Sequence, residues 1–336
     1  MQNKRNVFID IIKYLCAVEV IWMHSVNISP SLNQIMQIIN TIFMKITTIL
    51  PPVELFFVIS GYYLFLKKPD SKRVITWEKK LYITYFLYSF LYLRQITEHF
   101  AGRSFILNVL SVIRQFFFTG YSIMGWFIPA LAWGVMVVYG LGIIEKKIGT
   151  RLFSRLIIGV LSILSAIGST YYYVFPNNIM DIFIKLTGGI GILRGIIYVY
   201  IGYELAEFDI EKQIKKSELL LAAGLWCVMT ILAMYSQENG LGINTRGMIT
   251  KYMYVFELSL IIMKLSKKEI FTKMNGCNLG KISLVMYFTH VFILEHFVIS
   301  NYPLLCFFVA VLGSTFIGEL IVKGREKGIR IFKYYL

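Results

Sequence analysis

The chain has 336 residues, of which 57% are hydrophobic and only 16% are charged, and its mean hydropathy is +0.65. Soluble globular proteins are roughly 45–50% apolar and about 25% charged, so this composition indicates a membrane protein. It excludes a secreted hydrolase, a cytosolic dehydrogenase and a nucleic-acid-binding domain. The net charge of +15 has to be tested against membrane topology before it is taken as evidence for a ligand.

Taken in chain order, the apolar stretches predict about ten membrane-spanning helices, because one crossing of a bilayer needs about 20 apolar residues. The predicted spans are Val7–Asn27, Thr48–Leu66, Leu81–Phe100, Met124–Ile144, Leu156–Phe175, Leu186–Ala206, Leu219–Tyr235, Met248–Met263, Ile282–Ile299 and Pro303–Val322. The shorter, amphipathic stretch Phe105–Phe118 is interpreted as an interfacial or re-entrant segment. The expected fold is an all-α polytopic bundle, and residues 1–336 are expected to form one integral membrane domain.

The basic residues are distributed unevenly between the two sides of this predicted bundle. With the N-terminus in the cytoplasm, 25 Lys and Arg fall in the inside segments and 6 in the outside segments. This imbalance predicts that both termini are cytoplasmic. It explains most of the positive charge by topology and by attraction to anionic membrane lipids, so we expect no nucleic-acid partner.

The first span carries ionisable groups, which are costly inside a membrane and usually face a bundle interior. Lys13 and His24 differ by about 20° around an ideal helix and about 16 Å along it, so they share a face. Asp10 is close enough in sequence to pair with Lys13. Histidine can take a proton from an attacking hydroxyl group, which makes His24 a candidate catalytic base. The alternative is an interfacial ion pair and a histidine at the level of the lipid headgroups.

Further polar residues lie in the other spans. Glu54 follows the pair Pro51-Pro52 and is expected to orient His24 from across a helix interface, whereas Ser60-Gly61 is more typical of helix packing than of catalysis. Arg94 lies four residues before Glu98, so the two can neutralise each other. The remaining candidates are Trp126, Arg194, Glu257 and His290. Neither the histidine spacing nor the four cysteines predict a metal site or a disulfide framework.

Five short motifs, in order, resemble the acyltransferase 3 family of ten-helix bacterial membrane proteins. They are Arg5, Asp10, Lys13 and His24 in the first span; Leu55 to Tyr62 in the second; Lys79-Lys80-Leu-Tyr-Ile-Thr-Tyr85 in the third; Trp126-Phe127-Ile128; and Ser283-Leu-Val-Met-Tyr287-Phe-Thr-His290. The resemblance covers nearly the whole chain. Lys13 is the main departure, because the family has an arginine there and lysine lacks its planar, bidentate fork.

The resemblance implies an O-acyltransferase of the bacterial cell membrane. It implies transfer of an acyl group, commonly acetyl from acetyl-CoA, to a hydroxyl of a cell-surface or lipid-linked glycan, with no bound cofactor. His24 is then the base or acyl relay, with Lys13, Asp10 and Glu54 beside it. The residues Lys79, Lys80, Ser60, Arg94, Trp126, Arg194, Glu257 and His290 are expected to bind the donor or to line the pocket.

Two other functions fit parts of the sequence. A transporter or flippase would use Arg94, Arg194 and Glu257 to line a substrate path, although the internal repeats common in transporters are not seen. A polysaccharide polymerase would be expected to have a long external loop, and the longest predicted outside segment, residues 99–123, is short for that purpose. The enzyme is therefore the preferred interpretation.

Overall fold

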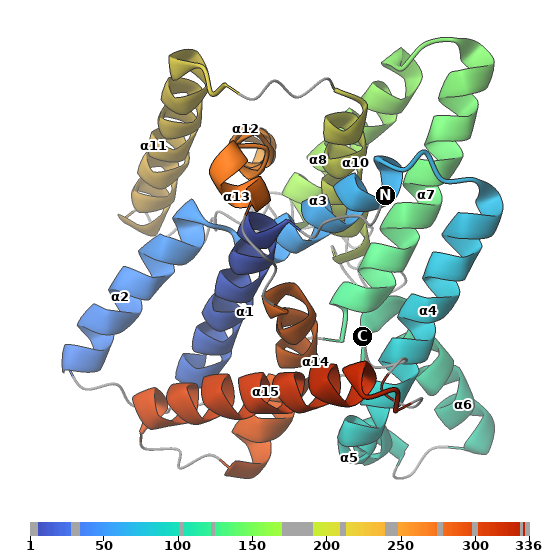
Figure 1. Cartoon of the computed structure of the whole chain (residues 1–336), viewed down its shortest axis with the longest axis vertical. Helices are drawn as coiled ribbons and strands as arrows, with labels where there is room; N and C mark the ends of the chain where they lie inside the picture. Colours follow the sequence, from blue (N-terminus) through green and yellow to red (C-terminus); the bar gives the residue numbers. More distant parts are fainter. Residues whose placement is uncertain are drawn as a thin grey trace. The chain divides into compact units, whose positions relative to one another are not determined.

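The computed structural model describes residues 6–27, 34–100, 104–121, 125–169, 191–208, 213–238, 248–273, 278–297, 302–329 and 332. Within these ranges every regular element is a helix, which confirms the predicted all-α class for the described part of the chain (Figure 1). Arg5 of the first motif and parts of four predicted spans, residues 124, 170–175, 186–190 and 298–299, lie outside the described residues.

The helices vary widely in length. The long ones are α1 (Val7–Asn27), α2 (Gln34–Ile49), α3 (Pro52–Phe65), α4 (Ser71–Ser89), α6 (Phe105–Arg114), α7 (Phe127–Ile148), α8 (Leu152–Ser169), α10 (Gly191–Glu207), α11 (Lys216–Glu238), α12 (Ile249–Ser266), α14 (Leu279–Phe297) and α15 (Pro303–Glu326). The short ones are α5 (Leu93–Thr97), α13 (Glu269–Lys273), the 3-10 helices η1 (Phe90–Tyr92) and η2 (Glu98–Phe100), and the π-helix η3 (Gln115–Thr119). The predicted first span coincides with α1.

Two predicted spans are wrong in their boundaries. Thr48–Leu66 is interrupted, because α2 ends at Ile49 and α3 begins at Pro52. Proline has no N–H to donate and is tolerated only in the first turn of a helix. Helix α2 occupies a stretch that had been assigned to an outside segment. Its 16 residues are fewer than the about 20 that one full crossing of a bilayer needs.

Leu81–Phe100 is also not one continuous helix. Helix α4 begins ten residues earlier, at Ser71, where the Asp70 carboxylate accepts a hydrogen bond from the Arg73 N–H at 2.8 Å. It ends at Ser89, whose hydroxyl donates to the Phe86 carbonyl at 2.5 Å and so competes with the helical pattern. The short elements η1, α5 and η2 follow.

Several helices are long and apolar enough to cross a membrane. Among the described residues there are five such segments, Gln34–Phe65, Phe127–Ile148, Leu152–Ser169, Lys216–Ser236 and Pro303–Glu326, judged by length and composition. The chain is therefore a multi-pass membrane protein. The number of ten crossings, the cytoplasmic termini and the single domain remain predictions.

The chain divides into two compact units, and α3 and α4 each pass from one to the other. The first unit contains Met1–Phe56, Lys79–His99 and Ser266–Leu336. Its core includes Trp22 of α1, Met286 of α14 and Ala310 of α15. Gly318 lies against Ile282 and Gly313 against Ile293, so α15 packs antiparallel to α14.

The second unit contains Phe57–Glu78 and Phe100–Leu265. Its helices α7 and α10 run parallel, because Gly134 lies against Gly195 and Gly142 against Tyr203. Helix α3 packs as closely on α10: a Cβ at Gly61 would lie 2.7 Å from the carbonyl oxygen of Val199. The predicted close approach at Gly61 is thereby confirmed.

Candidate functional site

Two histidines lie next to each other in the first unit, His24 on α1 and His290 on α14. Their ring centroids are 5.3 Å apart and the ring planes are inclined by 38°. His290 is 0% exposed, whereas His24 is partly exposed. Nδ1 of His290 lies 2.8 Å from the carbonyl oxygen of Met286, and Nε2 is buried without a hydrogen-bond partner in the described part of the chain. The pair thus combines one ring anchored to the backbone with one accessible ring.

The packing of Asp10 on Gly280 helps to bring the histidines together. A Cβ at Gly280 would lie 2.1 Å from Oδ1 of Asp10, so the buried carboxylate occupies the space where a side chain would begin. Asp10 precedes His24 on α1, and Gly280 precedes His290 on α14. The two helices therefore run parallel, and Asp10 and Gly280 set how closely they approach.

A tyrosine holds α14 on either side of His290. The Tyr92 hydroxyl donates to the Phe288 carbonyl at 2.7 Å and accepts from the Phe292 N–H at 3.2 Å. Tyr88 stacks on the Phe288 ring, with centroids 4.3 Å apart and planes only 3° from parallel. The sequence analysis did not single out either tyrosine. Their spacing of four residues is the signal that could have indicated one shared contact face.

Helix α2 supports the α1 turn that carries His24. Trp22 stacks on Phe43 with centroids 4.1 Å apart, and the Trp22 Nε1–H donates to Asn40 Oδ1 at 3.3 Å. Phe307 of α15 meets the same indole edge-on at 5.2 Å. The contacts of Trp22 with Phe43 and Asn40 were not predicted, because α2 was not predicted to be a helix.

Two further predicted site residues of the first unit are Lys13, nearer the start of α1 than His24, and Glu54 on α3. Lys13 is half-buried. Glu54 of α3 is buried, and the Cys16 thiol lies within electrostatic range of both Glu54 and Glu19. Glu19 is buried too, and its Oε2 has no hydrogen-bond partner among the described residues. A role for Glu54 in orienting His24 stays a prediction.

Three predicted basic residues lie on exposed surfaces of the first unit. Lys79 and Lys80 are exposed on α4. The Arg94 side chain is 86% exposed, and its Nε lies 3.1 Å from Oε1 of Glu98. The predicted neutralisation of Arg94 by Glu98 is confirmed.

Four predicted residues belong to the second unit. Ser60 is half-buried on α3. Trp126, just before α7, lies near the Phe57 ring at 6.2 Å and covers Gly191 at the start of α10. Arg194 has a buried Nε, and Glu257 a buried Oε1, that lack hydrogen-bond partners among the described residues. The role of these four residues in a pocket stays a prediction.

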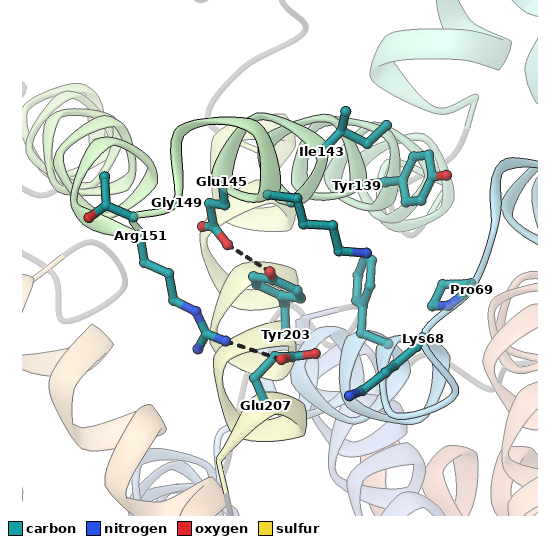
Figure 2. Close-up of a pocket in the computed structure, with 13 residues that line it drawn as sticks. Lys68, Pro69, Tyr139, Ile143, Glu145, Gly149, Arg151, Tyr203 and Glu207 are labelled. Atoms are coloured by element: carbon teal, nitrogen blue, oxygen red, sulfur yellow. Dashed lines mark hydrogen bonds and ion pairs between the residues drawn. The ribbon is translucent and has the colours of Figure 1, made fainter.

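The second unit also contains a hydrogen-bonded carboxylate cluster that the sequence analysis did not identify. The Tyr203 hydroxyl donates to Glu145 Oε2 at 2.7 Å, and the Tyr200 hydroxyl donates to Glu204 Oε1 at 2.7 Å. Arg155 binds both oxygens of Glu204, at 3.2 and 3.0 Å. Figure 2 shows the bond from Tyr203 to Glu145. From the sequence, Arg155 was only one of the 25 basic residues assigned to the inside segments.

The histidine pair is suited to proton transfer. We assign the Nδ1–H tautomer to His290 from its contact with the Met286 carbonyl, which leaves Nε2 as a proton acceptor. A neutral imidazole next to an accessible second imidazole can accept a proton from a hydroxyl group and pass it on. Within the described ranges, no group of three or more His, Cys, Asp or Glu side chains could hold a metal ion.

Fold and site together define a multi-pass membrane protein, helical throughout its described elements, with a histidine pair in which His290 is buried and His24 is partly exposed. The sequence model of a family described as an acyltransferase domain matches residues 6–323, so the chain belongs to the acyltransferase 3 family. This confirms the resemblance seen in the motifs. No curated protein and no solved structure matches the chain closely enough to be compared with it.

Proposed function

We propose that the protein is a membrane-embedded O-acyltransferase that moves an acetyl group from acetyl-CoA to a hydroxyl of a cell-surface or lipid-linked glycan. The observation that carries this proposal is the contact between His24 and His290, with its buried, unpartnered Nε2, in a chain of an acyltransferase family. The proposed location is the bacterial cell membrane. Membrane lipids, acetyl-CoA and the glycan acceptor are the proposed partners, and acetyl-CoA is consumed as a substrate.

In the proposed reaction His24 is the base. The acceptor hydroxyl oxygen attacks the thioester carbonyl carbon while a ring nitrogen of His24 takes the hydroxyl proton. The carbon–sulfur bond breaks, and the departing CoA thiolate takes that proton from the imidazolium. An ester and a free thiol result, and His24 is neutral again. His290 is a positioning residue, because it contacts the ring of His24 and is itself held by the backbone.

The donor is proposed to approach along the charged face of α1. Lys13 shares that face with His24 and would steady the phosphates of CoA, with Asp10 beside it. The exposed Lys79 and Lys80 would attract the same anionic donor through long-range electrostatics. The remaining residues proposed to line the pocket are Glu54, Ser60, Arg94, Trp126, Arg194 and Glu257.

The test compares His24→Ala with His296→Ala in purified, reconstituted protein supplied with acetyl-labelled acetyl-CoA. His296 is the control because it is another histidine of the first unit, is exposed near the end of α14, and was not predicted to be a site residue. We expect His24→Ala to abolish thioester hydrolysis and acceptor labelling, and His296→Ala to retain both. Membrane insertion and thermal melting check that the variants fold. Retained activity in a folded His24→Ala protein would refute the role.

The same assay separates the enzyme from a transporter or flippase. An enzyme releases free CoA thiol from acetyl-CoA, which a thiol reagent detects. A wild-type protein that moves labelled substrate across vesicles and never cleaves the thioester would support transport instead.

A further inference from the structure

A cavity opens in the second unit, whereas the histidine pair belongs to the first unit. Its volume is about 330 Å³, and it lies between the turn after α3, the end of α7, the start of α8 and the end of α10 (Figure 2). This volume is at the lower end of the roughly 300–1,000 Å³ typical of small-molecule sites. The cavity is therefore large enough for a small polar group.

The carboxylates that line the cavity already have donors. Glu145 accepts from the Tyr203 hydroxyl at 2.7 Å, and Glu207 accepts from the Arg151 Nη2 at 3.1 Å. Figure 2 shows both contacts on the same wall, with Tyr203 between Arg151 and Lys68 in this view. The charge of Glu207 is therefore compensated by Arg151, whereas Glu145 accepts from a neutral hydroxyl and keeps its negative charge.

The two lysines that line the cavity are not compensated in this way. Lys68 and Lys146 are exposed, and neither forms an ion pair with another described residue. With Arg151 matched by Glu207, and Glu145 left to offset one lysine at most, the lining carries an excess of positive charge. An excess of lysines beside a guanidinium group favours an anionic ligand.

The backbone places these donors around the opening. Lys68 has a φ of +44°, which makes it the one non-glycine residue with positive φ in the described part of the chain. Its N–H donates to the Phe65 carbonyl at 2.8 Å, and Pro69 follows it, so the turn is tightly defined. Gly149 and Thr150 form the turn into α8, whose N-terminal end carries partial positive charge toward the same side.

We propose that this cavity binds a phosphate ester, with Lys68 and Lys146 as its charge partners and Arg151, paired with Glu207, beside them. Lysine is a compact point charge suited to phosphate, and the Tyr203 hydroxyl adds a polar group on the inner wall. The predicted topology puts both lysines on the cytoplasmic side, where lipid phosphodiesters and soluble phosphate compounds both occur. The phosphate chemistry is common to both sources, and the proposal does not depend on the acyltransferase mechanism.

The experiment uses full-length protein with two probes. Inorganic pyrophosphate, titrated by calorimetry, reports a soluble source. Native mass spectrometry of protein from nanodiscs of phosphatidylglycerol or phosphatidylcholine reports a lipid source. The double variant Lys68→Gln/Lys146→Gln is compared with Lys147→Gln, which removes an adjacent exposed lysine that does not line the cavity.

We expect the double variant to weaken binding of at least one probe tenfold or more, with Lys147→Gln unchanged and with binding weakened by added salt. Loss of pyrophosphate binding assigns a soluble phosphate ester, and loss of phosphatidylglycerol retention assigns a lipid. Lys68→Arg/Lys146→Arg keeps the charge and should retain binding, which separates a lost ligand contact from a fold defect. If neither probe binds, or if Lys147→Gln weakens probe binding as much as the double variant does, the proposal is overturned. Lys68 and Lys146 then serve only membrane topology.

Discussion

The histidine pair of the first unit and the carboxylate cluster of the second differ in how their buried polar groups are satisfied. In the first unit, Nε2 of the fully buried His290 has no described hydrogen-bond partner, although a second histidine ring lies 5.3 Å away. In the second unit, Glu204 accepts from Tyr200 and from two nitrogens of Arg155. A buried polar group without a partner is destabilising, so proteins retain it mainly where chemistry or binding requires it. The contrast supports the proposed catalytic role of the histidine pair and predicts a stabilising role for the carboxylate cluster.

The strongest test of this contrast is His290→Asn. The Asn side chain can still donate to the Met286 carbonyl, but it lacks a nitrogen at the Nε2 position. If His290 supports proton transfer through His24, turnover should fall on the order of 100-fold or more, with little change in the donor KM. The measurement is the steady-state rate of thioester cleavage. His296→Asn should behave as wild type, and equal losses in both variants would remove the basis for the contrast.

Gly280→Ala perturbs the same site from a distance. The new methyl group would overlap the Asp10 carboxylate, so either this buried carboxylate is displaced or α14 shifts away from α1. We expect a destabilisation of about 1–3 kcal/mol, together with reduced turnover as the histidines separate. Thermal melts and activity are compared with Gly159→Ala, where a Cβ meets nothing within 4 Å. A Gly280→Ala protein with unchanged melting and turnover would show that the contact does not set the helix spacing.

Glu204→Ala tests the other side of the comparison. Removal of this carboxylate takes away the acceptor of the Arg155 guanidinium and leaves the Tyr200 hydroxyl only its longer contact with Glu145 Oε1, at 3.5 Å. The expected loss of stability is about 1–3 kcal/mol, from the weakened hydrogen bonding of the buried hydroxyl and the lost charged pair. The turnover of the folded fraction, measured below the melting transition, should stay within twofold of wild type. A large fall in turnover with normal melting would instead indicate a catalytic role for the cluster.

Arg94→Ala should have the smallest effect. Its partner is Glu98, and the two side chains are 86% and 54% exposed. Such a pair contributes about 0–1 kcal/mol, and less as salt is added. We expect melting and thioester cleavage close to wild type. A clear loss of substrate movement or of activity would revive a functional role for Arg94, including the path expected of a transporter.

Some features could be predicted because they depend on neighbours in sequence. Helix α1 was predicted with its observed limits, since its apolar run is long and continuous. The close approach at Gly61 follows from the chemistry of glycine itself, whereas the predicted span Thr48–Leu66 ran across the interruption at Pro51. Helix α2 was not predicted because its 16 residues are too few for a full crossing. Its helical character is nevertheless visible in Ile35, Ile38 and Ile42, which recur at helical spacing.

The sequence by itself determined the membrane class, the all-helical fold and the family, because composition, hydropathy and short motifs are local properties of the chain. It also identified His24 and His290 as candidates, but separately. Only the tertiary structure decided that these two rings meet, that Tyr92 holds the turn beside them, and that Glu145, Glu204 and Arg155 belong to one cluster. Helix packing brings together residues far apart in the chain, and no local pattern encodes which faces will meet.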